Sequence, residues 1–302
     1  MTQEFYSNGK LLLTGEYAIL DGAKGLAVPT KFGQSLKINT TNSGLLSWKS
    51  IDVHNDTWFS AEFDPKDLSI VRYSDEAIAT TLQEILLVAK KLNPKFLNDG
   101  LSLEAITTLN FPRKWGLGTS STLINNIAQW AQIDAHQLLW NSFGGSGYDI
   151  SCAQHNTPII YAIEEKRPKV TIAAFNPAFK NHIYFVYLNQ KQSSKKAIKN
   201  YRSKKGATQE LILKINKLTT AITDTESLSE FESLIEKHET ILSNILEITP
   251  VKKELFSDYF GTVKSLGGWG GDFVMATGNE KTPEYFISKG FNIVIPFTEM
   301  VL

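Results

Sequence analysis

Residues 111–122 read Phe-Pro-Arg-Lys-Trp-Gly-Leu-Gly-Thr-Ser-Ser-Thr, a glycine-containing turn that leads into a run of helical periodicity. The apolar positions of the following helix are spaced to form one buried stripe: Leu123, Ile124, Ile127, Ala128 and Ala131. Such a turn presents unpaired backbone N–H groups and the positive end of the helix dipole to a ligand above the helix N-terminus. The stretch therefore predicts an anion site, and a triphosphate fits that geometry.

Three hydroxyl side chains, Thr119, Ser120 and Ser121, follow the second glycine of this stretch. They can cap the helix, donate to phosphate oxygens or ligate a hard cation such as Mg²⁺, which prefers oxygen ligands. In a second interpretation, Gly116 and Gly118 make a tight turn and Ser120 is an ordinary N-cap. The stretch is neither a Walker A loop, which ends in Gly-Lys-Ser or Gly-Lys-Thr, nor a dinucleotide-binding fingerprint. On these residues alone, both interpretations stay open.

The composition limits the classes of function. With 302 residues, 42% of them hydrophobic, the chain is long enough for two packed domains. Its 31 basic and 31 acidic residues cancel, so there is no global field to attract a nucleic acid or an anionic membrane. We therefore expect neither kind of partner.

Cys152 is the only cysteine, which excludes an intramolecular disulfide and a thiolate zinc cluster and suits a reducing compartment. Met1 to Tyr6 show no basic region followed by an apolar run, and no stretch approaches the ~18 apolar residues of a membrane helix. We expect a cytoplasmic protein.

Local patterns predict several elements in the first half of the chain. Strand-like segments lie at residues 10–13 and 35–38, and apolar residues alternate over 101–105. Ser74 is a candidate N-cap for a helix with apolar residues at helical spacing from Ile78 to Ala89.

In the second half, residues 182–188 are β-branched or aromatic and too few for a core helix, so they predict a buried strand that opens a new unit. Apolar residues from 228 to 245 recur with the spacing of a long amphipathic helix. Thr249 and Pro250 are typical of an N-cap and a first-turn residue of the next helix. The basic stretch 191–205 predicts a solvated loop or helix face, with a phosphate-binding patch as the alternative.

Three segments together resemble the motifs of the GHMP kinase superfamily. Gly-Leu-Gly-Thr-Ser-Ser after Pro112 resembles its central ATP-binding motif, and residues 8–22 resemble its N-terminal motif. Residues 264–272, Lys-Ser-Leu-Gly-Gly-Trp-Gly-Gly-Asp, resemble its C-terminal glycine loop. The motifs occur in the family's order and span nearly the whole chain.

The resemblance implies an α+β fold of two domains. The first, over residues 1–177, would be the ATP-binding domain, similar to ribosomal protein S5 domain 2. The second, over residues 178–302, would be ferredoxin-like. ATP and a small-molecule acceptor would meet in the cleft between them, and the protein would be a monomer or homodimer.

Details of the motifs resemble phosphomevalonate kinases more than mevalonate kinases: Gly-Glu-Tyr at 15–17, Gly-Ser-Gly-Tyr-Asp at 145–149 and Gly-Gly-Asp at 270–272. The Gly-Tyr-Asp-Ile run also resembles a bacterial subgroup named for Gly-Tyr-Asp-Ile-Ala. The resemblance therefore implies phosphorylation of phosphomevalonate in isoprenoid biosynthesis. Mevalonate kinase, other alcohol or sugar kinases, diphosphomevalonate decarboxylase and a non-catalytic ligand-binding relative stay open as alternatives.

The sequence departs from the family pattern at several positions. Asn8 replaces the usual proline and Ser121 the usual alanine, while Trp115 and Trp269, which we expect to be packing residues, stand where small residues are commoner. Leu138 occupies the position of a metal-binding glutamate in mevalonate kinases. Either Thr119 or Ser120 holds Mg²⁺ with waters and phosphates, or the protein is catalytically weak.

The resemblance also implies roles for individual residues. Asp149 takes the catalytic position facing the acceptor, and Lys10 pairs with it and stabilises charge on the transferring phosphoryl group. ATP would contact Gly116, Leu117, Gly118, Thr119, Ser120 and Ser121, with Thr119 and Ser120 also ligating Mg²⁺. The acceptor would contact Glu16, Tyr17, Ser146, Gly147, Gly268, Gly270, Gly271 and Asp272.

Structural alternatives remain for four of these features. Asp149 can be a helix N-cap, Lys10 an edge-strand lysine in water, and Glu16 a carboxylate that caps backbone N–H groups. The glycine loop at 267–271 can be a plain turn.

Overall fold

The structure, a computed structural model, describes residues 2–190, 194–203, 208–269 and 272–302. The chain forms two compact units, and neither is a continuous segment. The first unit consists of residues up to Gly9, Phe32–Arg113 and Leu117–Gln154. The second consists of Lys10–Lys31, Lys114–Gly116 and His155–Leu302. The boundary predicted between residues 177 and 178 does not coincide with this division.

Two long strands contribute residues to both units: β1 (Thr2–Leu12) and β2 (Gly25–Thr40). The remaining strands of the first unit are β3 (Leu46–Ile51), β4 (Thr57–Phe63), β5 (Ile70–Tyr73) and β6 (Leu103–Leu109). Their order is β5-β4-β3-β6-β2, in which β3 and β6 are parallel and the other neighbours antiparallel. The strand predicted at 35–38 is confirmed, and the strand predicted from residue 101 begins at Leu103.

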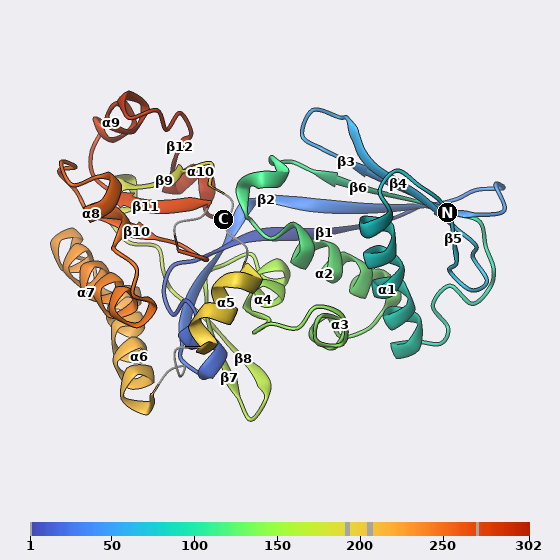
Figure 1. Cartoon of the computed structure of the whole chain (residues 1–302), viewed down its shortest axis with the longest axis horizontal. Helices are drawn as coiled ribbons and strands as arrows, with labels where there is room; N and C mark the ends of the chain where they lie inside the picture. Colours follow the sequence, from blue (N-terminus) through green and yellow to red (C-terminus); the bar gives the residue numbers. More distant parts are fainter. Residues whose placement is uncertain (1, 191–193, 204–207, 270–271) are drawn as a thin grey trace. The chain divides into compact units, whose positions relative to one another are not determined.

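Helices cover one face of this sheet, and Figure 1 shows α1, α2 and α3 side by side along it. The helices of the first unit are α1 (Glu76–Leu92), α2 (Thr119–Ala131), α3 (Ala135–Ser142) and α4 (Tyr148–Gln154). The short 3₁₀ helix η2 (Arg113–Trp115) precedes α2. Alternate residues of β6 are buried, and strand residues such as Trp48 and Ala105 form one core with helix residues such as Leu86 and Ile127.

The second unit contains two groups of strands. In the first group, β7 (Ile159–Glu164) pairs with the beginning of β2 and with β8 (Arg167–Ile172). The second group is an antiparallel sheet in the order β10-β11-β9-β12. Its strands are β9 (Ile183–Tyr187), β10 (Val263–Ser265), β11 (Phe273–Thr277) and β12 (Val294–Pro296).

The helices of the second unit are α5 (Ser194–Ser203), α6 (Gln209–Asp224), α7 (Leu228–Leu246), α8 (Val251–Leu255), α9 (Thr282–Ser288) and α10 (Phe297–Met300). Two 3₁₀ helices, η1 (Ala18–Asp21) and η3 (Lys180–His182), complete it. The long helix predicted over 228–245 is confirmed as α7. An α+β architecture with a four-stranded antiparallel sheet in this unit agrees with the expected fold class.

Strand β9 explains why residues 182–188 have a continuous apolar pattern. Each residue of β9 is buried, and the strand lies between β11 and β12. On one side, Phe185 stacks on Phe297 with ring centroids 6.3 Å apart. A strand that is covered on both faces shows no alternation of apolar and polar residues.

The starts of three helices differ from the sequence-based predictions. Asp75, not Ser74, caps α1, because its carboxylate accepts the Ile78 N–H at 3.0 Å while the Ser74 hydroxyl accepts the Ser60 N–H. Gly118, not Ser120, occupies the N-cap position of α2. Pro250, not Thr249, precedes α8.

The described part of the basic stretch at 191–205 contains the helix α5 and not a loop. Lys199 and Arg202 of this helix are exposed, as predicted for a solvated helix face, whereas Tyr201 is fully buried.

The cap of α1 gives a test of this local geometry. Replacing Asp75 with alanine leaves the Ile78 N–H without its acceptor, and we expect the free energy of unfolding to fall by about 1 kcal/mol. Urea titration followed by circular dichroism measures the change. Glu76→Ala, in the first turn but outside the cap position, is the matched control. Equal losses in the two variants would contradict the assigned cap.

Candidate active site

The N-terminus of α2 lies in the first unit and presents main-chain N–H groups. Gly118 has a φ of 94° and makes no side-chain cap, and the first intrahelical bond joins Thr122 N–H to the Gly118 carbonyl at 2.9 Å. The N–H groups of residues 119–121 precede that bond, so they have no partner within the helix. Anions are stabilised at such a position by these donors and by the helix dipole.

The hydroxyl groups of this turn have different roles. Ser121 is buried, and its hydroxyl donates to the Gly118 carbonyl at 2.8 Å, as does that of Thr122 at 3.1 Å. Ser120 is exposed and Thr119 is half-buried. Thr119 and Ser120 are therefore better placed for a ligand than Ser121. Leu117 is fully buried, so its side chain packs and only its backbone is available.

Asp149 lies in the first turn of α4, in the same unit as α2. The Gly147 that precedes this helix has a φ of 85°, and its carbonyl accepts the Ser151 N–H at 3.1 Å. The Asp149 carboxylate is half-buried and accepts the N–H of Ile150 at 3.2 Å. Ser146 and Gly147, both predicted to contact the acceptor, are buried in the turn before the helix.

Two side chains hold α4 in place within the first unit. His136 Nε2 lies 3.0 Å from the Ser151 hydroxyl, and Gln154 donates to Asn125 of α2 at 3.0 Å. Burial lowers the pKa of His136, so the neutral imidazole is favoured. The second contact links the helix that carries Asp149 directly to α2.

Three residues from three different motifs come together in the second unit. Lys10 Nζ donates to the Gly116 carbonyl at 3.0 Å. Gly116 has a φ of 67°, and a Cβ at this position would lie 1.9 Å from Asp272 Oδ2. Only a glycine permits both this backbone conformation and this close approach. The N-terminal, central and C-terminal motifs therefore meet around Gly116.

Some predicted site residues are not tested by this arrangement. Asp149 belongs to the first unit and Lys10 to the second, so their pairing stays a prediction. Gly268 is half-buried, whereas Gly270 and Gly271 lie outside the described residues. Trp115 packs edge-to-face on Phe273 with ring centroids 5.6 Å apart, as expected of a packing residue.

Tyr17 occupies a strained turn and an aromatic cluster. Its backbone has a φ of 63° and a ψ of −49°, and the Ala18 N–H donates to the Glu16 carbonyl at 2.7 Å, which forms a γ-turn of the rare positive-φ kind. The buried ring stacks on Tyr201 at 5.4 Å, in a core that also includes Trp269. The Tyr201 hydroxyl donates to Asp21 at 2.6 Å.

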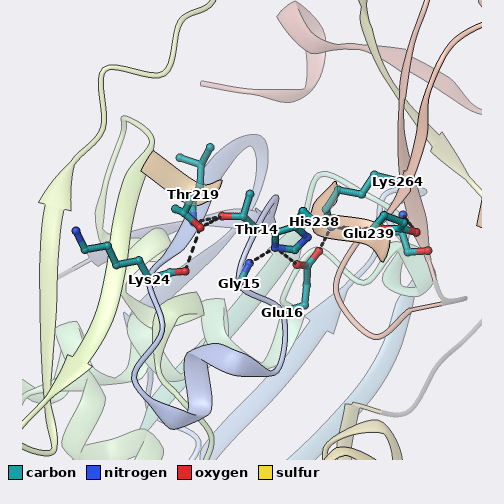
Figure 2. Close-up of polar contacts among 10 residues, drawn as sticks. Thr14, Gly15, Glu16, Lys24, Thr219, His238, Glu239 and Lys264 are labelled. Atoms are coloured by element: carbon teal, nitrogen blue, oxygen red, sulfur yellow. Dashed lines mark hydrogen bonds and ion pairs between the residues drawn. The ribbon is translucent and has the colours of Figure 1, made fainter. Parts of the chain in front are cut away.

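Glu16 is buried and faces other protein groups. Its carboxylate pairs with Lys264, whose side chain has an exposed fraction of 0% against 1% for Glu16. Figure 2 shows this pair beside His238 and Glu239 of α7. His238 Nε2 accepts the Gly15 N–H at 3.0 Å, and Glu239 accepts the Ser265 N–H at 3.1 Å.

Lys264, His238 and Glu239 are not among the site residues predicted from the sequence. The available signal was Lys264 itself, a cation in a short strand directly before the glycine loop. The sequence-based alternative for Glu16, a carboxylate that caps backbone N–H groups, does not include the ammonium partner that the structure gives this residue.

Burial dominates the electrostatics of this cluster. Desolvation raises the pKa of Glu16 to about 7, although Lys264 opposes the shift, and it also raises the pKa of Glu239. Burial and the positive charge of Lys264 lower the pKa of His238 well below its ordinary value. Burial therefore favours the protonated form of Glu16 up to about pH 7, and the negative charge of Glu239 adds to the shift.

Comparison with solved structures identifies the architecture. A Streptococcus pneumoniae phosphomevalonate kinase, solved with phosphomevalonate and AMPPNP, matches with a TM-score of 0.71 and 14% identity over 97% of this chain and 99% of that chain. The Methanococcus jannaschii mevalonate kinase matches with a TM-score of 0.69 and 14% identity over 96% and 94%. The chain has the two-domain GHMP kinase fold.

A mevalonate diphosphate decarboxylase from Staphylococcus aureus also shares this fold, with a TM-score of 0.60 and 11% identity over 99% of this chain and 96% of that chain. No protein-family model and no curated protein sequence matches the chain. At these identities the similarity establishes the fold, which hosts more than one reaction.

Within residues 2–190, 194–203, 208–269 and 272–302, no group of three or more His, Cys, Asp or Glu side chains is arranged to hold a metal ion. Leu138, at the position of the glutamate of mevalonate kinases, is fully buried.

Among the helices of the same residues, none combines the length and apolarity needed to cross a membrane.

The raised pKa of Glu16 predicts a pH-dependent contribution to stability. Between pH 4.5, the ordinary pKa, and about 7, the folded state holds a proton that the unfolded state has lost. The stabilisation from Glu16 is therefore complete below that window and lost as the pH rises through it, by up to about 3 kcal/mol. Glu16→Gln removes this term, so its free energy of unfolding should improve relative to the wild type as the pH rises.

Urea titrations of the two proteins at several pH values across the window measure this difference. His238, whose lowered pKa acts with the opposite sign, is present in both proteins. A difference that is independent of pH would contradict the assigned proton on Glu16.

Proposed function

We propose that this protein is an ATP-dependent, magnesium-dependent kinase that phosphorylates phosphomevalonate in isoprenoid biosynthesis. The observation that carries the proposal is the meeting of Lys10, Gly116 and Asp272, which come from three motifs, in a chain with the GHMP kinase fold. The motif details at 15–17, 145–149 and 270–272 favour phosphomevalonate over mevalonate. The Streptococcus pneumoniae structure with this fold holds phosphomevalonate and AMPPNP.

The N-terminus of α2 supports the assignment of the ATP phosphates. Its first N–H groups precede the first intrahelical bond, and Thr119 and Ser120 add hydroxyl groups. Hydroxyl oxygens suit Mg²⁺, which also accepts water and phosphate ligands, so Thr119 or Ser120 would hold the ion without a carboxylate from position 138. When bound, Mg²⁺ neutralises charge on the phosphates.

The residues of the chain would position the reactants and stabilise charge. An acceptor phosphate oxygen bonds to the γ-phosphorus while the bond from that phosphorus to the β,γ-bridging oxygen breaks, and ADP leaves. A phosphate monoester has a second pKa near ~6, so its oxygen is already ionised at neutral pH and needs no general base. Lys10, oriented by the Gly116 carbonyl, stabilises the transferring group, and Asp149 orients the reactants.

Substitution of Lys10 tests the proposal. Purified protein is offered ATP and Mg²⁺ with phosphomevalonate, mevalonate, homoserine or a sugar, and ADP release is measured. Phosphomevalonate should give the fastest turnover, and Lys10→Met should reduce it by about tenfold or more because the charge at the transferring group is lost. Lys31→Met is the matched control, since Lys31 also donates to a main-chain carbonyl, that of Thr298, at 2.8 Å.

Asp149→Asn distinguishes the acceptor classes in the same assay. With a phosphate acceptor the loss should be smaller than for Lys10→Met, whereas an alcohol acceptor needs Asp149 as a base and the loss should be at least as large. If both variants stay within about threefold of the wild type, the site assignment is wrong. Release of CO₂ from diphosphomevalonate would identify a decarboxylase, and ATP binding without turnover a non-catalytic relative.

We further propose that the protein acts in the cytoplasm as a monomer or homodimer, with small molecules as its partners and without a nucleic acid or membrane. The zero formal charge supports the exclusion of polyanionic partners.

A further inference from the structure

Four buried ionisable side chains lie between two segments of the proposed site. Glu16, His238, Glu239 and Lys264, here named the ionic cluster, all belong to the second unit. On one side of the ionic cluster lies the turn at residues 15–17, and on the other lies the segment 265–268, in which Ser265 leads into the glycine loop. Figure 2 shows the cluster, with Gly15 of the turn and the preceding Thr14 next to it.

The ionic cluster binds the turn through both main chain and side chain. The Gly15 N–H donates to His238 Nε2 at 3.0 Å, and the Glu16 carboxylate pairs with Lys264. Next to these contacts, the Thr14 and Thr219 hydroxyls lie 2.9 Å apart, so α6 also holds this segment. The turn is therefore fixed by residues far from it in the sequence.

The same ionic cluster holds the residue that precedes the glycine loop. Ser265 donates its N–H to Glu239 Oε1 at 3.1 Å and accepts a hydrogen bond on its carbonyl from Lys264 Nζ at 2.8 Å. Charged side chains thus fix both main-chain groups of Ser265. Lys264 is common to the two segments, because it binds Glu16 of the turn and the carbonyl of Ser265.

Stability alone does not account for this arrangement. A buried ion pair is often no better for stability than well-packed apolar residues of the same volume, because both charges lose their hydration. Within the part of the chain that the structure describes, the buried atoms Glu16 Oε2, Glu239 Oε2 and His238 Nδ1 moreover have no hydrogen-bond partner. Directional bonds from charged groups do, however, restrict the backbone to one geometry more strictly than apolar contacts.

We propose that the ionic cluster consists of positioning residues, which hold the turn at 15–17 and the loop at 265–268 as one coupled element. Lys264 has the central role because it joins the two segments. Two experiments test this proposal. The measurement of kinase activity rests on the proposed function, whereas the measurement of hydrogen exchange does not.

Hydrogen exchange measured by mass spectrometry tests the coupling without any substrate. At pH 8, above the pKa of Glu16, Glu16→Gln should raise amide exchange about tenfold or more not only at residues 14–18 but also at 265–269, which Glu16 reaches through Lys264. In Glu239→Gln, amide exchange should rise at residues 265–269, which Glu239 contacts, and also at residues 14–18. Exchange that rises only in the segment each variant contacts would overturn the proposal.

A matched control separates coupling from general destabilisation. Phe286→Leu removes packing from another core of the same unit, formed with Val186, Phe256 and Val274. It should leave exchange at 14–18 and 265–269 within about twofold of the wild type under native conditions. A similar rise in this variant would also overturn the proposal.

The measurement of kinase activity uses Lys264. Lys264→Met leaves two buried carboxyl groups without their cation, so kcat should fall about tenfold or more, while KM for ATP changes less than about threefold because α2 has no residue in the ionic cluster. At pH 8, above the pKa of Glu16, the double variant Glu16→Gln/Lys264→Met removes one charge of each sign and should recover part of the loss in kcat. Strictly additive losses would contradict a coupled element.

Failure of the two proposals can be distinguished. If the wild type phosphorylates no acceptor, the proposed function is wrong, and the exchange experiment still decides the coupling. If the wild type is active and exchange changes stay local, only the coupling is wrong. Should Lys264→Met not fold, the two single-charge variants Glu16→Gln and Glu239→Gln carry the test.

Discussion

The ammonium of Lys264 and the carboxylate of Glu16 are enclosed together, out of reach of water. An unpaired buried charge would cost several kcal/mol there, and even beside Lys264 the pKa of Glu16 is raised by burial. The pair therefore constrains the chain: β10 and the turn after β1 must meet, and helix α7 must supply His238 and Glu239 at the same place. The geometry of the segments around the proposed acceptor site follows from this one requirement.

A second constraint acts at Gly116. Its carbonyl accepts a hydrogen bond from Lys10, and the space that a Cβ would fill is taken by the carboxylate of Asp272. The residue type is thus determined by backbone conformation and by a neighbouring side chain from another motif. This explains why glycine is required at a position where a local sequence pattern shows only a turn.

Much of the fold could be predicted from local patterns. The apolar run of β9 and the helical spacing of α7 are strong periodic signals, and three motifs in order indicated the architecture. Helix starts were predicted less well, because Ser74 and Asp75 are both good caps and only the tertiary contact of Ser74 with Ser60 selects between them. The partners of Glu16 are more than two hundred residues away, and no local rule brings Lys264 to a particular carboxylate.

Tyr17 combines a backbone conformation that tyrosine disfavours with a ring that is stacked and buried. Glycine would suit the dihedral angles but would leave a cavity beside Tyr201, while most other side chains would satisfy neither demand. Few amino acids are therefore compatible with this position, even though its ring hydroxyl need not take part in any reaction. If few amino acids occur at residue 17 among relatives, the reason would then be backbone strain and side-chain packing rather than ligand recognition.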